Sequence, residues 1–196
     1  GQGNPFTISF VAEGIHYLRQ GMPNYPEAES HAAIVRDQIL IDIQQAILSE
    51  NAWSPVDAAA SDKKVVGNES LGAKGAVAIF PYPPSAYLTQ LAYRVLKQWN
   101  ASIEEIDASV HSWSRTEINK QIALIAARSR AADPMQLAYA LITAVDSRPD
   151  TAANPEDKEI FSHALHTFFS AQNRTDGGWP LSRPMFHYKE VGNAYC

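Results

Sequence analysis

Apolar residues recur along most of this chain with the three-to-four-residue spacing of amphipathic helices. Residues 8–20 show a short pattern of this kind that ends at Gly21 and Pro23. Within residues 30–49, Leu40, Ile43 and Ile47 stand at i, i+3 and i+7. The same reading predicts further helices near residues 84–99, 103–110, 115–130, 134–147 and 155–171.

Local signals mark the expected beginnings of these helices. Proline in the first turn costs little, because that turn has no hydrogen-bond partner for its N–H groups, and a preceding Asp or Asn can cap the helix. A Ser followed three residues later by Glu fits the capping box. The positions that fit these patterns are Pro84, Ser102 with Glu105, Ser114 with Glu117, Asp133–Pro134 and Asn154–Pro155.

Strand signals are weak throughout the chain. Residues 65–80 could form a hairpin at most, and residues 50–82 are rich in Ala, Ser, Gly, Lys and Pro without clear periodicity. We therefore expect an all-α protein interrupted by a long irregular loop at 50–82, either mobile or acting as a lid.

A short recurrence suggests that the helices are arranged in repeats. The tetrapeptide QLAY begins at Gln90 and again at Gln136, and Gln44 stands 46 residues before the first of them. Trp53 and Trp99 each follow their glutamine by nine residues. A period of this length equals one helix pair with its loops, as in α-solenoids and α/α barrels.

The helix predicted at 155–171 runs into Gln172, a polar turn, Gly178 and Trp179. This order, with Phe168 and Phe169 before the glutamine, resembles the QW repeat of the terpenoid cyclase and prenyltransferase family. The resemblance implies helical hairpins that form an α/α toroid or half-toroid, with an α-solenoid as the related alternative. It also implies that the Gln and Trp side chains are mainly framework.

The acidic motifs of that family are absent from the sequence. Neither Asp-X-Asp-Asp, which supplies a proton, nor Asp-Asp-X-X-Asp, which holds magnesium, occurs here. The favoured hypothesis is therefore an interaction or scaffolding module without a complete catalytic motif. The alternative is a terpenoid-cyclase-like or prenyl-binding enzyme domain that holds an apolar ligand in an aromatic cavity, so enzymatic activity stays an open question.

The end of the chain holds the candidate ligand-binding residues. Aromatic side chains with polar tips, held between Pro and Gly residues, are typical of an amphipathic pocket. The candidates are Trp179, Phe186, Tyr188 and Tyr195, and Asp176 and His187 are candidates for catalysis. The alternative interpretations are that Asp176 forms an ordinary turn before two glycines and that the tail packs over a helix end.

Glu159, His163 and His166 share one side of the helix predicted at 155–171. Such a row of side chains could hold a metal ion. We favour the structural interpretation instead, with His163 as a packing histidine and Glu159 in solvent. The sequence predicts no metal and no cofactor.

Composition excludes several classes of protein. The 196 residues, 45% of them apolar, suit one helical domain, and the net charge of −5 without a basic stripe argues against nucleic-acid binding. A single cysteine and the lack of a long apolar run predict a cytoplasmic protein without a membrane span. Because aromatic residues continue to Cys196, we expect a part of a longer protein. Its expected partner is another chain or the missing remainder, with an isoprenoid-like small molecule as a further candidate.

Overall fold

The computed structural model describes residues 5–21, 26–34, 38–49, 73–78, 83–148, 154–172, 175 and 177–179. These ranges contain helices and turns and no strand, which confirms the all-α prediction for the part described. No helix within them is long and apolar enough to cross a membrane. The helices are α1 (Pro5–Gly21), α2 (Pro26–Ile34), α3 (Leu40–Leu48), α4 (Ala86–Gln98), α5 (Glu104–Ala126), α6 (Pro134–Ser147) and α7 (Pro155–Ser170).

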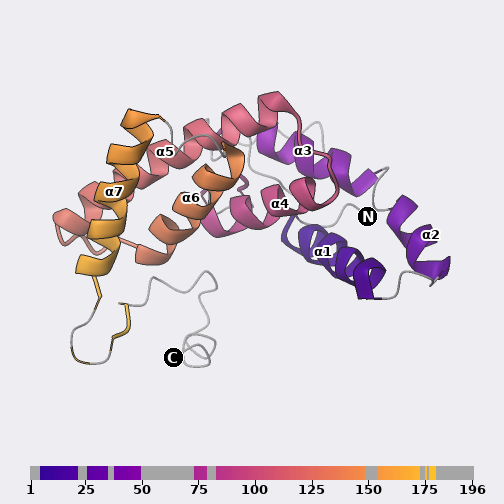
Figure 1. The fold of residues 1–196 in the computed structure, drawn as a ribbon, viewed down its shortest axis with the longest axis horizontal. Coiled ribbons are helices and arrows are strands. Elements are labelled where there is room, and N and C mark those ends of the chain that lie inside the picture. The colour runs from indigo at the N-terminus through magenta and orange to yellow at the C-terminus, as the bar shows by residue number, and fades with distance from the viewer. Residues whose placement is uncertain are drawn as a thin grey trace, which may run out of the picture.

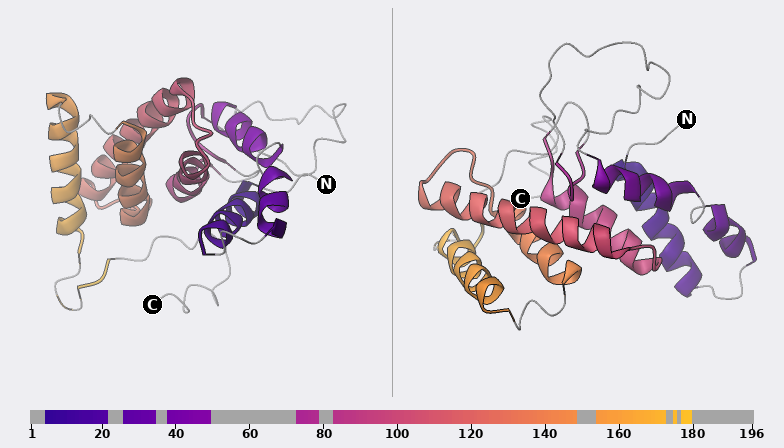
Figure 2. Two further views of the ribbon diagram at one scale, coloured as in Figure 1. Left: turned by 45° about the vertical axis from the view of Figure 1, so that its right-hand side comes forward. Right: turned by 90° about the horizontal axis from the view of Figure 1, so that it is seen from above.

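The long helix α5 organises the molecule (Figure 1). Helix α6 packs against both α4 and α5, and α7 packs against α5 and α6. On the other side, α1 packs against α4, while α3 contacts α1, α4 and α5. Figure 2 shows α5 from above, running from α3 at one end to α7 at the other.

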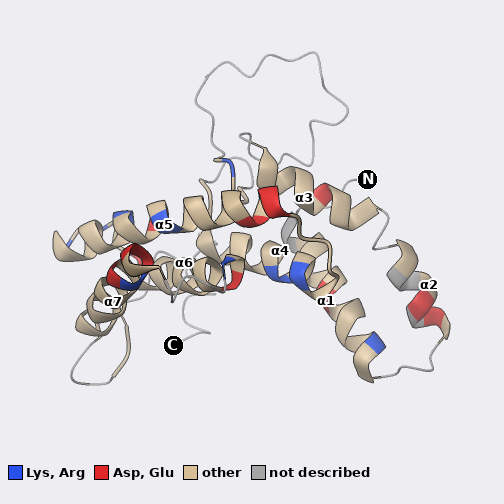
Figure 3. Ribbon diagram, turned by 45° about the horizontal axis from the view of Figure 1, so that its top comes forward, with Lys and Arg blue, Asp and Glu red and all other residues tan. Residues whose placement is uncertain are grey.

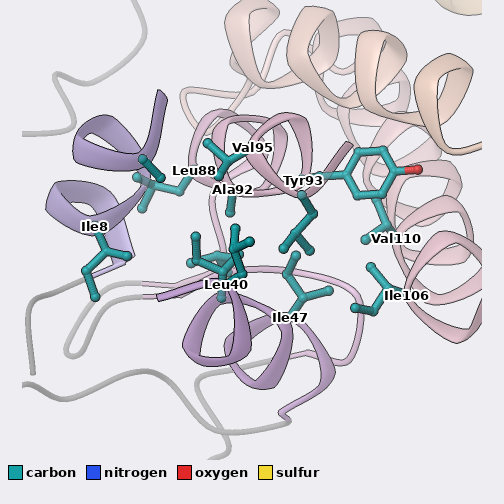
Figure 4. Close-up of a cluster of buried hydrophobic side chains, with 13 residues drawn as sticks. Ile8, Leu40, Ile47, Leu88, Ala92, Tyr93, Val95, Ile106 and Val110 are labelled. Carbon is teal, nitrogen blue, oxygen red and sulfur yellow. The ribbon is translucent and has the colours of Figure 1, made fainter. Parts of the chain in front are cut away.

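Two clusters of buried apolar side chains hold these helices together. The first joins α1, α3 and α4 to the beginning of α5, where Ile106 and Val110 are fully buried (Figure 4). The second joins the later part of α5, around Ile118, to α6 and α7. Because α5 contributes residues to both clusters, it connects the two parts of the hydrophobic core.

The predicted caps of α6 and α7 are confirmed. Asp133 accepts hydrogen bonds from the backbone N–H groups of Met135, at 2.9 Å, and Gln136, at 3.3 Å. Asn154 accepts one from Glu156 at 3.1 Å. At α4 the cap is Ser85, so Pro84 precedes the helix instead of lying in its first turn.

The prediction of two helices at 103–110 and 115–130 is wrong, because α5 runs unbroken from Glu104 to Ala126. Ser114, expected to cap the second helix, is fully buried inside α5. Ser102 does not cap the helix either: its hydroxyl donates to Asp107, and the capping position is Ile103, which makes no side-chain hydrogen bond. Burial of one face of α5 along its whole length keeps the helix continuous.

Between 50 and 82 the structure describes residues 73–78, which form turns and irregular backbone without a strand. Ala76, Val77 and Ala78 are buried there. The N–H of Gly75 donates to the carbonyl of Ile47 at 2.8 Å, and the N–H of Val77 donates to the Thr89 hydroxyl at 2.9 Å. This part of the predicted loop is therefore tied to α3 and α4. The rest of the predicted loop lies outside the described residues.

Two of the recurring glutamines bind opposite ends of α4. The Gln44 amide donates to the carbonyl of Ala101, just beyond the end of α4, at 2.6 Å. The side-chain oxygen of Gln136 accepts from the N–H of Ala86, the first residue of α4, at 2.6 Å. Gln136 satisfies an N–H group that the start of a helix leaves without an intrahelical partner, whereas Gln44 fixes the loop that follows α4.

Candidate functional site

Of the residues predicted to bind a ligand, the structure describes only Trp179. Its ring stacks on Phe168 with centroids 4.6 Å apart, and its indole N–H donates to the Phe168 carbonyl at 2.8 Å. The Gln172 amide donates to the carbonyl of Gly177 in the turn between them. These contacts hold the turn against the end of α7. The other candidates, Asp176, Phe186, His187, Tyr188 and Tyr195, lie outside the described residues.

Helix α7 does not bury the side chain of His163. Both His163 and His166 are exposed, and with Glu159 they border an open depression on α7. The prediction of a packing histidine at 163 is wrong, because α7 packs through Ala164 and Thr167 instead. Among the described residues no group of three or more His, Cys, Asp and Glu side chains is placed to hold a metal ion.

A cluster of charged and polar side chains that the sequence did not reveal lies where α7 begins. Asp157, in the first turn of α7, is completely buried. Its carboxylate faces two residues of α5: the Arg115 Nε atom is 3.1 Å from Oδ1, and the His111 Nε2 atom is 3.7 Å from Oδ2. Figure 3 shows the acidic residues at the beginning of α7. The cluster joins α7 to α5 through charge.

The other side of His111 faces the end of α6. Its Nδ1 atom is 3.2 Å from the carbonyl oxygen of Ala144, a contact that places a proton on Nδ1. Burial lowers the pKa of His111 from its ordinary value of 6.5, while the Ala144 carbonyl and the charge of Asp157 partly offset this effect. The positive charges of Arg148 and Arg115 lower the pKa further.

Ser147, His111 and Asp157 stand in the spatial order of a catalytic triad, but their hydrogen bonds do not suit one. A nucleophilic serine needs a neighbouring base that accepts its proton. The Ser147 hydroxyl donates to the Ala144 carbonyl at 3.1 Å, and the nearest ring atom, Nδ1, carries a proton for the same oxygen. Both side chains are also buried. The arrangement fastens the end of α6 to α5.

A cavity of about 640 Å³ lies beside this cluster and follows one face of α5. Eight of its lining residues belong to α5, from Glu104 to Asn119, and the other two are Ser147, the last residue of α6, and Arg148, which follows it. Its lining includes His111 and Arg115, so two residues of the charged cluster also border the cavity. The volume is in the range of about 300–1,000 Å³ that is usual for small-molecule sites.

The opposite end of the cavity contains a second polar cluster around Asp107. The carboxylate of Asp107 accepts from the Tyr93 hydroxyl at 2.7 Å and from the Ser102 hydroxyl, and the Lys97 ammonium is 3.6 Å away. Burial and this contact with Asp107 raise the pKa of Tyr93. Asp107 is thus satisfied by its neighbours within the fold.

We expect His111 to make stability depend on pH. Because folding lowers its pKa below 6.5, the unfolded chain binds this proton more readily than the folded protein. The stabilising contribution is therefore present above pH 6.5 and lost as the pH falls below that value. Urea unfolding between about pH 5 and pH 7 should show a flatter pH dependence for His111→Gln than for the wild type.

The comparison of the two proteins isolates His111 from the other titrating groups. Asp146 has a raised pKa because of burial, so its contribution runs in the opposite direction and is common to both proteins. Equal slopes for the wild type and His111→Gln would contradict the assignment of the pH dependence to His111.

Comparisons with known proteins do not assign this chain to a family. It matches no protein-family model, and neither the curated proteins nor the solved structures contain a significant match.

Proposed function

We propose that this domain is an interaction module that presents one face of α6 to an amphipathic helix of a second protein chain. The observation that supports this is an apolar row of Met135, Ile142 and Val145, which are 45%, 46% and 49% exposed. They lie on one side of α6, while Leu137, Ala140 and Ala144 are fully buried against the rest of the domain. We call the exposed row the α6 face.

The spacing of the α6 face favours a helical occupant. With half-buried Ala138, the residues stand at positions 135, 138, 142 and 145, which is the three–four alternation of a coiled-coil seam. Large side chains at such positions insert between those of a facing helix, and small Ala138 leaves room for one of them. Covering this row would stabilise the complex by about 25 cal/mol for each Å² of apolar surface removed from water.

The finer architectural prediction of an α/α toroid, half-toroid or α-solenoid belongs to this proposal. The packing of α6 against α5, its predecessor in the chain, and of α7 against α6 supports helical hairpins. In such an arrangement a further helix pair would continue the series by covering an exposed helix face.

A photo-crosslinking amino acid placed at Ile142 in the native host tests the proposal. We expect one discrete crosslinked product, whose joined peptide comes from an apolar helix of another protein. Adding Met135→Glu should reduce the yield about tenfold, because a carboxylate cannot be buried cheaply in the seam. The matched control carries the crosslinker at Ser162, an exposed polar residue of α7.

Two results would contradict the proposed docking. One is an equal product at Ser162. The other is a joined peptide from this same chain, which would indicate self-association or a contact within the chain.

A further inference from the structure

We propose that the cavity along α5 binds the phosphate group of a small phosphorylated molecule between Arg115 and Arg148. The inference concerns other residues than the α6 face and does not depend on its docking role. Both arginines line the same cavity, and so does Ser112, which precedes Arg115 by about one helical turn. Guanidinium groups bind phosphate oxygens in pairs, because their N–H donors form a rigid fork.

Of the two arginines that line the cavity, Arg148 is the one without an ion pair to any described residue. It follows directly after α6, and its backbone N–H donates to Val145 at 3.3 Å, but within the described part of the chain its guanidinium forms no ion pair. The preceding residue, Ser147, has its hydroxyl 3.5 Å from Nδ1 of His111, and both His111 and Arg148 line the cavity. An anion in the cavity would therefore meet Arg148 without breaking a contact of the fold.

Arg115 is anchored by one part of its guanidinium only. Its Nε atom is held by buried Asp157 at 3.1 Å, while a terminal nitrogen is 3.6 Å from the Glu156 carboxylate. Because the Glu156 side chain is 79% exposed, that second contact contributes little and can be exchanged for a ligand. Asp157 thus fixes the Nε side of Arg115, and a phosphate oxygen can replace exposed Glu156 at the terminal nitrogens.

Two carboxylates, those of Asp157 and Glu156, pair with Arg115 at 3.1 and 3.6 Å, so Arg148 supplies the positive charge that is not already compensated. The acidic residues that line the cavity itself, Glu104 and Asp107, lie toward its other end. Glu104 precedes Arg115 by eleven helical residues, which corresponds to roughly 16 Å along α5 at 1.5 Å per residue. That separation exceeds the Debye length of about 8 Å at physiological salt, so repulsion is mostly screened. Asp107 is paired with Lys97 and hydrogen-bonded by Tyr93.

The volume of the cavity indicates an organic phosphate ester. A phosphate group alone would occupy only a small part of about 640 Å³. The remaining wall carries Asn119, whose amide suits a hydroxylated, polar body such as a sugar, and Thr116, whose hydroxyl donates to the Ser112 carbonyl at 3.1 Å and can still accept a hydrogen bond. A purely apolar body would take water away from the Asn119 amide without replacing its hydrogen bonds.

Titration of the isotope-labelled chain, followed by NMR at constant ionic strength, tests the site. We use inorganic phosphate, glucose 6-phosphate and succinate as probes, with chloride as the balancing anion. We expect shifts at residues 111–119 and 147–148, a millimolar dissociation constant for phosphate, and tighter binding of glucose 6-phosphate. Arg148→Gln should weaken phosphate binding about tenfold.

Arg130→Gln is the control, because it removes the same charge from an exposed arginine at the other end of α5, outside this cavity. Its phosphate affinity should equal that of the wild type. Since Arg148 is exposed and its side chain forms no ion pair with the described residues, its variant should keep the wild-type melting temperature. Equal weakening by both substitutions, shifts spread over the whole surface, or tighter binding of succinate than of phosphate would each overturn the proposal.

Discussion

Replacing Asp157 by asparagine should lower the free energy of unfolding by about 3 kcal/mol, the lower end of the range for breaking a buried ion pair. The Asp157 side chain is fully buried and compensates the charge of Arg115, which is 30% exposed. Asparagine keeps the volume but leaves the guanidinium without a counter-charge. The loss falls at the lower end because a partly exposed Arg115 can turn toward water. Urea unfolding at pH 7.5 measures it.

Glu156→Gln is the matched control for this substitution. It removes the same charge from the neighbouring residue, which is 79% exposed and 3.6 Å from Arg115. An exposed pair of this kind contributes about 0–1 kcal/mol, so the control should unfold almost like the wild type. If both variants lost the same stability, the effect would come from the net charge of the α7 terminus and the buried cluster would not hold α7 in place.

The helix ends that sequence analysis predicted correctly depend on neighbouring residues alone. Asp133 and Asn154 cap the next helix through backbone groups two or three positions away, so the sequence contains the whole interaction. Ser114 fits a local capping pattern equally well, yet it lies inside α5. The difference is its burial against other helices, which depends on tertiary packing that a local pattern does not contain.

The same distinction explains why the charged cluster was missed. His111 and Arg115 come from the middle of α5, whereas Asp157 comes from the first turn of α7. An acidic residue in a first turn is ordinary, because it suits the helix dipole, so Asp157 gave no sign of being buried. A sequence signal for the pair would require knowing that α5 is continuous at Ser114, since only then do His111 and Arg115 share one helical face.

Gly75→Ala should destabilise the domain by about 2–5 kcal/mol, combining backbone strain with forced overpacking. Gly75 has a φ of +91°, in the region that favours glycine. A Cβ atom there would be only 2.1 Å from the carbonyl oxygen of Ser109 in α5. Because the obstacle is backbone, no side-chain rotation can relieve it. Either segment 73–78 or α5 must move, and the hydrogen bond from Gly75 to Ile47 would be strained.

The same substitution at Gly14 should act in the opposite direction. Gly14 lies within α1, and an added Cβ would have no heavy atom within 4 Å. Alanine is favoured over glycine in a helix by about 1 kcal/mol, so Gly14→Ala should raise the unfolding midpoint. Opposite signs for one chemical change would show that segment 73–78 packs tightly across α5. Stabilisation by both substitutions would mean that this segment does not pack against α5. Val77 would then not be part of the first apolar cluster.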